Sequence, residues 1–152
     1  QSGKQVFSSE YRLLKNRNSL ILSPIENRQL PEAFLVKENQ SEVNIPLKLS
    51  ICKAFDISIS SLSTIFVDED KLAYPLVIRR WRQGDVFQPL GMNGKTKKIS
   101  KLFKDEKVSV LDKENSWLLC SNNTIIWVVG IRQDERFKVD SKTKNILKIH
   151  LQ

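Results

Sequence analysis

The sequence predicts an α+β fold in which sheet dominates: a small β-rich domain of mixed or antiparallel strands with one or two short helices. Short apolar runs recur along the whole chain and are separated by turn-forming residues. One segment, KKISKLFKD at residues 97–105, shows the clear apolar spacing of a helix. The chain has 152 residues, 40% of them hydrophobic, which is enough for one ordinary domain or two small ones.

The segment before residue 75 is predicted to consist mainly of strands. The runs VFSSEYRLL and SLILSP flank the turn-prone KNRN, which predicts a hairpin within residues 1–24. ENRQLPEAF reads as a polar link interrupted by Pro31. Residues 43–67 alternate between apolar and polar, most clearly at Ile57, Ile59 and SLSTIFV, and predict half-buried sheet. We assign residues 1–74 to a β-rich N-terminal part.

Residues 75–152 are assigned to a second, C-terminal domain that opens at Pro75. Its first strand, LVIRRW, places two sets of residues on opposite faces: Val77, Arg79 and Trp81, and Ile78, Arg80 and Arg82. Neither face is wholly apolar, so we expect this strand to end at the rim of a sheet, with its arginines emerging into solvent. SWLLC and TIIWVVG are predicted strands joined by the turn SNNT, and ILKIHLQ is the last strand.

The predicted helix at residues 97–105 has two distinct sides. Ile99, Leu102 and Phe103 lie at i, i+3 and i+4 and predict a buried stripe. The opposite side carries Lys97, Lys101 and Lys104, which we expect to be exposed. A helix this short needs the sheet to hold it.

The net charge of +8 is concentrated in one stretch. Residues 79–107 contain nine Lys or Arg residues and three acids, so they carry +6 of that charge. Such clustering is typical of a surface that binds a polyanion, with nucleic acid the first candidate and an acidic membrane surface the second. A solvated charged face is the plainer alternative. No stretch approaches the roughly 18 apolar residues that span a bilayer, so we expect a cytoplasmic protein.

Residues that suggest catalysis or metal binding are few. Cys52 and Cys120 have no metal-site spacing and are expected to be small buried hydrophobes. Asp134 and Glu135 lack a companion histidine, and salt bridges to the flanking arginines are expected instead. His150, the one histidine of the chain, lies in an alternating strand and is a weak catalytic candidate. We therefore predict no catalytic residue and no metal site in this chain.

Three residues near the basic stretch have alternative interpretations. Trp81 and Phe87 could stack on a nucleotide, although aromatic residues at such positions more often belong to the core. Asp85 follows a glycine and is expected to accept hydrogen bonds from nearby backbone N–H groups in a turn.

Residues 78–103, IRRWRQGDVFQPLGMNGKTKKISKLF, and residues 125–139, IIWVVGIRQDERFKV, resemble the C-terminal domain of bacterial tRNA(Ile)-lysidine synthetase. The matching features are the arginine-rich strand before Gly84 and Asp85, the PLGM turn, the paired lysines that open an amphipathic helix, and the RQDER segment after Gly130. The first residues include no initiator Met, and we expect the chain to be a C-terminal fragment of a longer protein.

The resemblance implies the fold of that domain, which is shared with phenylalanyl-tRNA synthetase. It also implies that the parent protein is an ATP-dependent carbon–nitrogen ligase. Full-length members use ATP, with Mg, to activate the wobble cytidine of an isoleucine tRNA, and lysine then displaces AMP to form lysidine. Their ATP chemistry belongs to an N-terminal domain with a Ser-Gly-Gly-x-Asp-Ser loop, which is absent from this sequence. This chain alone is thus expected to be non-catalytic and to need no cofactor.

The resemblance further implies that this chain binds tRNA(Ile) at the acceptor stem. Lysine and ATP would meet only the N-terminal domain, and whether the chain forms a homodimer is left open. Recognition of A-form RNA relies on phosphates and shape, for which strand-borne arginines and loop-borne lysines are suited. We predict tRNA contacts from Arg79, Arg80, Arg82, Lys95, Lys97, Lys98 and Lys101. The alternative is a basic, β-rich interaction module that binds protein or DNA.

Overall fold

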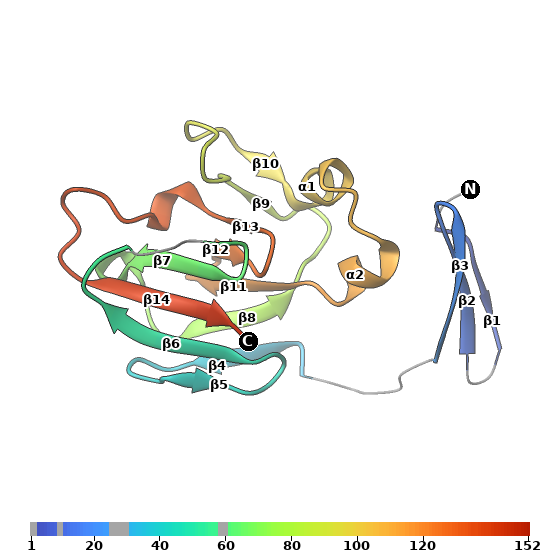
Figure 1. Ribbon diagram of the computed structural model, residues 1–152, viewed down its shortest axis with the longest axis horizontal. Coiled ribbons are helices and arrows are strands. Elements are labelled where there is room, and N and C mark those ends of the chain that lie inside the picture. The colour runs from blue at the N-terminus through green and yellow to red at the C-terminus, as the bar shows by residue number, and fades with distance from the viewer. Residues whose placement is uncertain (1–2, 9–10, 25–30, 58–60) are drawn as a thin grey trace.

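The structure, a computed structural model, describes residues 3–8, 11–24, 31–57 and 61–152. Its first three strands form a separate antiparallel sheet: β1 (Gln5–Phe7), β2 (Tyr11–Asn16) and β3 (Ser19–Pro24). The predicted hairpin is confirmed as β2 and β3, whereas the predicted run VFSSEYRLL is divided between β1 and β2. Figure 1 shows this sheet at one end of the molecule, beyond helix α2 (Val110–Glu114).

The main body contains a five-stranded and a four-stranded antiparallel sheet. The first has the order β13-β12-β11-β8-β4, formed by β13 (Arg132–Gln133), β12 (Thr124–Val128), β11 (Trp117–Ser121), β8 (Leu76–Arg80) and β4 (Ala33–Val36). The second has the order β5-β6-β14-β7, formed by β5 (Glu42–Val43), β6 (Leu49–Ala54), β14 (Ile146–Leu151) and β7 (Thr64–Asp68). The predicted β-rich α+β class is confirmed.

The larger core lies where inward-facing side chains of the two sheets meet. Val36 and Ile78 come from the five-stranded sheet, and Ile51, Leu147 and Ile149 come from the four-stranded sheet. Alternation explains this arrangement, since every second side chain of a strand points to the same face. Short 3-10 turns, η1 (Glu69–Lys71) and η2 (Glu135–Phe137), follow β7 and β13.

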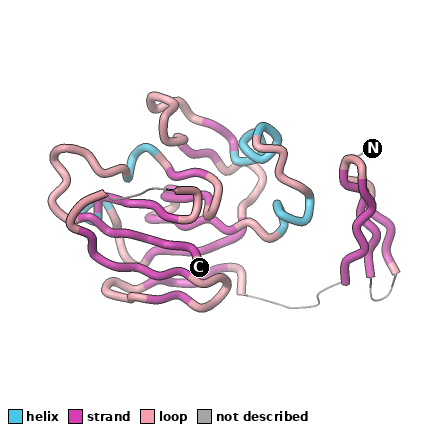
Figure 2. The backbone as a smooth tube through the Cα atoms, in the orientation of Figure 1, coloured by secondary structure: helices cyan, strands magenta, loops and turns pink. Residues whose placement is uncertain are grey.

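A second core lies on the other face of the five-stranded sheet. It is covered by the two-stranded ribbon β9 (Val86–Phe87) and β10 (Lys97–Lys98) and by helix α1 (Ile99–Asp105). Figure 2 shows how short the helices are beside the strands. The predicted stripe is confirmed, because Ile99, Leu102 and Phe103 are all fully buried. One detail was wrong: the paired lysines form a strand opposite β9, and the helix begins at Ile99, two residues later than predicted.

Other local predictions were wrong for identifiable reasons. Half of AFLV was assigned to a polar link, but the whole of it forms β4, which pairs with β8 on the side opposite β11. In the region 43–67, the strands are β5, β6 and β7. Ile57 lies beyond the end of β6 and is exposed, and Ile59 lies outside the described residues. Cys120 is buried as expected, but Cys52 is exposed.

Both main sheets combine strands from either side of the predicted boundary at residue 75. β4 pairs with β8, and β6 and β7 both pair with β14. Residues 33–57 and 61–152 therefore share one sandwich core. Within the described residues, no helix is long and apolar enough to cross a membrane.

Candidate nucleic-acid interface

The basic stretch begins where β8 ends in a tight turn closed by Asp85. The Asp85 N–H donates to the Arg82 carbonyl (3.1 Å), and the Arg82 N–H donates to the Asp85 carboxylate (2.7 Å). Gly84 has a φ of +94°, which glycine adopts without a Cβ clash. The predicted turn role of Asp85 is confirmed.

Asp85 also fixes Arg79 through a two-pronged ion pair. Both Arg79 terminal nitrogens donate to the carboxylate at 2.9 Å, and the Arg79 side chain is only 13% exposed. Burial raises the pKa of Asp85, but the hydrogen bonds from Arg79 and from the Arg82 backbone outweigh it, and the pKa falls below its usual value. The hydrogen bond to Asp85 in turn raises the pKa of Arg79. Arg79 is therefore held inside the protein's own structure.

Arg80 and Trp81 also make contacts within the chain. The Arg80 guanidinium lies over the Trp117 ring, 4.6 Å from its centroid, and donates to the Glu114 carbonyl. Trp81 packs edge-on against Phe103 and donates its indole N–H to the Lys113 carbonyl (3.0 Å). Phe87 is 1% exposed. The core interpretation of both aromatic residues is therefore confirmed, and Arg80 is exposed but oriented.

Asp105 gathers two of the predicted lysines at the end of α1. Lys97 lies 2.8 Å and Lys101 lies 3.2 Å from its carboxylate. Hydrogen bonds from both lysines hold the pKa of Asp105 below its usual value. The Lys97 side chain is 17% exposed and that of Lys101 is 61% exposed. The expected exposure of Lys97 was thus wrong, because its side chain extends to the Asp105 carboxylate and pairs with it.

The remaining cations of the stretch are exposed and form no ion pair with any residue that the structure describes: Arg82, Lys95, Lys98, Lys104 and Lys107. Lys104 and Lys107 were missing from the predicted contact set. The sequence could have indicated Lys104. An acid at i+3 or i+4 could pair with this lysine on a helix, but those positions hold Lys107 and Val108. These five exposed cations are the part of the stretch best able to meet an anion.

The loop between β9 and β10 is anchored by acids from the RQDER segment. Asp134 is fully buried and accepts hydrogen bonds from the Gln88 N–H (2.9 Å) and the Arg136 side chain (2.8 Å). Glu135 accepts from the Gly91 N–H (2.9 Å). The expected pairing of Asp134 with Arg136 is confirmed.

The other expected pairs in the RQDER segment are replaced by new ones. Glu135 pairs with Lys138 at 2.5 Å, and Arg132 pairs with Glu106 at 3.4 Å. Arg132 also donates to the Leu90 carbonyl (3.4 Å). Together these contacts hold the base of the β9–β10 loop, and Lys95 in that loop is exposed.

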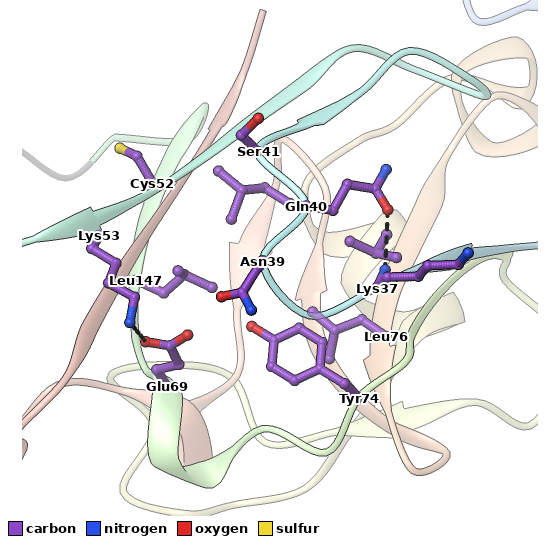
Figure 3. A pocket seen from close by; sticks show the side chains of 12 residues that line it. Lys37, Asn39, Gln40, Ser41, Cys52, Lys53, Glu69, Tyr74, Leu76 and Leu147 are labelled. Atoms are coloured by element: carbon purple, nitrogen blue, oxygen red, sulfur yellow. Dashed lines mark hydrogen bonds and ion pairs between the residues drawn. The ribbon is translucent and has the colours of Figure 1, made fainter.

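A separate pocket of about 150 Å³ lies between the β4–β5 loop, β6 and the segment before β8. Figure 3 shows the Tyr74 hydroxyl and the Asn39 amide in it, beside the ion pair of Lys53 and Glu69 (3.7 Å). Burial, and then the nearby Glu69 and Glu38 carboxylates, raise the pKa of Tyr74. None of the seven predicted tRNA contacts, all of them described by the structure, lines this pocket.

His150 has a structural partner on the neighbouring strand. Its Nδ1 lies 2.7 Å from the Thr64 hydroxyl on the adjacent strand. Among the described residues, no group of three or more His, Cys, Asp or Glu side chains could hold a metal ion.

Comparison with known proteins identifies the family. The model of the TilS substrate C-terminal domain matches residues 76–151, which is half of the chain. This chain belongs to the TilS C-terminal domain family. A second family model, the TilS substrate binding domain, matches residues 1–25, the part that contains β1, β2 and β3.

Relatives agree with the TilS assignment. The tRNA(Ile)-lysidine synthase of Parabacteroides distasonis is 40% identical over 97% of this chain and 34% of its own length. That of Bacteroides thetaiotaomicron is 36% identical over 97% of this chain and 32% of its own length. The chain thus spans about a third of these relatives. A crystal structure of a TilS C-terminal domain has the same fold, with a TM-score of 0.58 at 20% identity, covering 80% of this chain and 93% of that one.

Proposed function

We propose that this chain binds the acceptor stem of an isoleucine tRNA within a tRNA(Ile)-lysidine synthetase. The N-terminal catalytic domain of that enzyme would use ATP and lysine to convert the wobble cytidine to lysidine. The names of the relatives support the enzyme context. The observation that carries the tRNA-binding role is the set of five exposed cations around the β9–β10 ribbon and α1 that have no ion-pair partner in the described part of the chain.

The geometry suggests a division of labour among the seven predicted residues. Arg82, Lys95 and Lys98 are exposed and would contact phosphates directly. Arg80 and Lys101 are exposed but oriented by Trp117 and by Asp105. Arg79 and Lys97 are largely buried in ion pairs and would position the others: Arg79 through Asp85, and Lys97 through Asp105. Lys104 and Lys107 would add two contacts.

The proposal is tested by binding of tRNA across a salt series. Each neutralised phosphate contributes roughly 0.7–0.9 to the slope of log affinity against log salt. Changing Lys95, Lys98 and Lys104 to Ala should reduce the slope by about 2–3 and weaken binding of different tRNAs similarly. The matched control changes Lys37, Lys142 and Lys144 to Ala, which removes the same charge from exposed positions outside the stretch.

Two outcomes would overturn the assignment. Equal losses in both triple variants would show that only total charge matters. Equal affinity for a B-form DNA duplex and for tRNA would favour a general polyanion-binding module. A separate incubation with ATP, lysine and unmodified tRNA(Ile) should give no lysidine, because the chain has no phosphate-binding loop of the required kind.

A further inference from the structure

The sheet of β1, β2 and β3 has two faces of very different character. Register places Val6, Leu13 and Leu22 side by side across the three strands, and Tyr11 and Leu20 lie on the same face. All five are exposed: Val6 67%, Tyr11 46%, Leu13 37%, Leu20 66% and Leu22 66%. We call these five residues the outer apolar face. A contiguous apolar patch of this kind marks an interaction surface, whereas single exposed apolar residues do not.

The opposite face of the same sheet contacts the main body in part, although Phe7, which pairs with Arg12 on that face, is 64% exposed. Leu14 is fully buried there, and Arg12 donates to the Glu114 carboxylate of α2 at 2.9 and 2.5 Å. Arg12 also donates to the Ser23 hydroxyl on β3 (3.2 Å). Since these contacts turn the inner face toward the main body, the main body cannot cover the outer apolar face as well.

We propose that the outer apolar face docks the remainder of a TilS substrate binding domain, carried on the same longer polypeptide. The model of that domain matches this chain only at residues 1–25, which hold exactly these strands. The relatives are about three times as long as the region that this chain matches. Each of them therefore has further polypeptide that could cover the outer apolar face.

The dimensions suit one amphipathic helix. Three strands separated by about 4.8 Å present a face about 10 Å wide, which is close to the diameter of a helix. Lys4 and Lys15 are exposed on this face and favour a helix with acids beside its apolar stripe. A second copy of the chain fits less well, because each copy carries a net charge of +8 and would repel the other.

The test compares side-chain accessibility in the chain alone and in a longer protein. A chimaera is made in which this chain replaces the aligned third of the Parabacteroides distasonis relative. Leu22→Cys and, as a second probe, Tyr11→Cys are introduced with Cys52→Ser, and alkylation rates are measured in both proteins. Leu35→Cys is the matched control, since Leu35 is 60% exposed but lies on β4.

We expect alkylation of Leu22→Cys and Tyr11→Cys to slow by about tenfold or more in the chimaera, because burial excludes the reagent. The control probe should react equally in both proteins. Equal alkylation rates of the outer-face probes in the two proteins would overturn the proposal. Slow, concentration-dependent labelling in the chain alone would also overturn it, because it would identify a second copy as the occupant. Radical footprinting tests the same point without a chimaera, by comparing the unaltered full-length relative with its aligned third alone. Unchanged oxidation of the segment aligned with β2 and β3 would also overturn the proposal.

Discussion

Replacing Asp85 by Asn tests whether this turn organises the start of the basic stretch. The carboxylate accepts two hydrogen bonds from Arg79 and one from the Arg82 N–H. Asn keeps the shape but has one acceptor oxygen and no charge, so Arg79 loses its counter-charge while it stays largely buried. Hydrogen bonds to charged groups contribute about 1.5–3 kcal/mol each, and the remaining exposure of Arg79 lets water compensate in part. We expect the free energy of unfolding to fall by about 2–3 kcal/mol at pH 7, which corresponds to a fall of roughly 5–10 °C in Tm.

The stabilisation by Asp85 should depend on pH in a defined direction. The pKa of Asp85 is lowered in the folded chain, so its contribution is complete above the unfolded pKa of about 3.9 and disappears as the pH falls through the lower folded value. The stability gap between the native chain and Asp85→Asn should be constant near neutrality and close below about pH 4. Denaturant unfolding at pH 7, 5, 4 and 3 measures it.

The control for this experiment is Asp105→Asn. Asp105 also binds two cations, but it does so at the exposed end of α1, where an ion pair contributes little. A native-like Tm for Asp85→Asn, or a gap that persists unchanged to pH 3, would refute the role given to Asp85.

Three further predictions concern packing and the backbone. Leu102→Ala and Phe103→Ala should each cost about 2–5 kcal/mol in denaturant unfolding, because both side chains are fully buried; an unchanged midpoint would contradict the second core. Lys107→Gly should raise stability by about 0.5–1 kcal/mol in the same assay, since Lys107 directly follows the C-cap residue of α1, Glu106, and has a φ of +54°; a loss of stability would contradict this helix end. A thiol reagent should modify Cys52 alone in the native chain and also Cys120 after unfolding; burial raises the pKa of the Cys120 thiol, and two fast native thiols would contradict its placement.

Local periodicity predicted the elements whose neighbours in space are also neighbours in sequence. The stripe of Ile99, Leu102 and Phe103 follows from helical spacing alone, and it was fully confirmed. The exposure of Cys52 could have been predicted in the same way, because Leu49 and Ile51 fix the inward face of β6 and leave Cys52 outside. The strand β4 was harder to predict, since AFLV forms a strand by pairing with β8, whose residues come at least 40 positions later in the chain.

The charged residues were predictable as a cluster but not as individuals. Arg79 and Lys97 were assigned to the surface because sequence counts charges and does not show their partners. Arg79 meets an acid six residues away across a turn, and Lys97 meets one eight residues away along a helix. Such pairings depend on the exact path of the backbone, so they emerge only from the folded structure.

The three acids within residues 79–107 explain how so long a basic stretch can fold. Asp85 holds Arg79, Asp105 holds Lys97 and Lys101, and Glu106 is bound by Arg132 from outside the stretch. Every acid is thereby engaged, and each fixes a cation whose position shapes the turn, the ribbon or the helix. The charge that remains belongs to side chains that form no ion pair with any described residue. Solubility alone would be served as well by mixed signs, whereas an uncompensated surplus on an anchored stretch is what the proposed binding of a phosphate backbone would need.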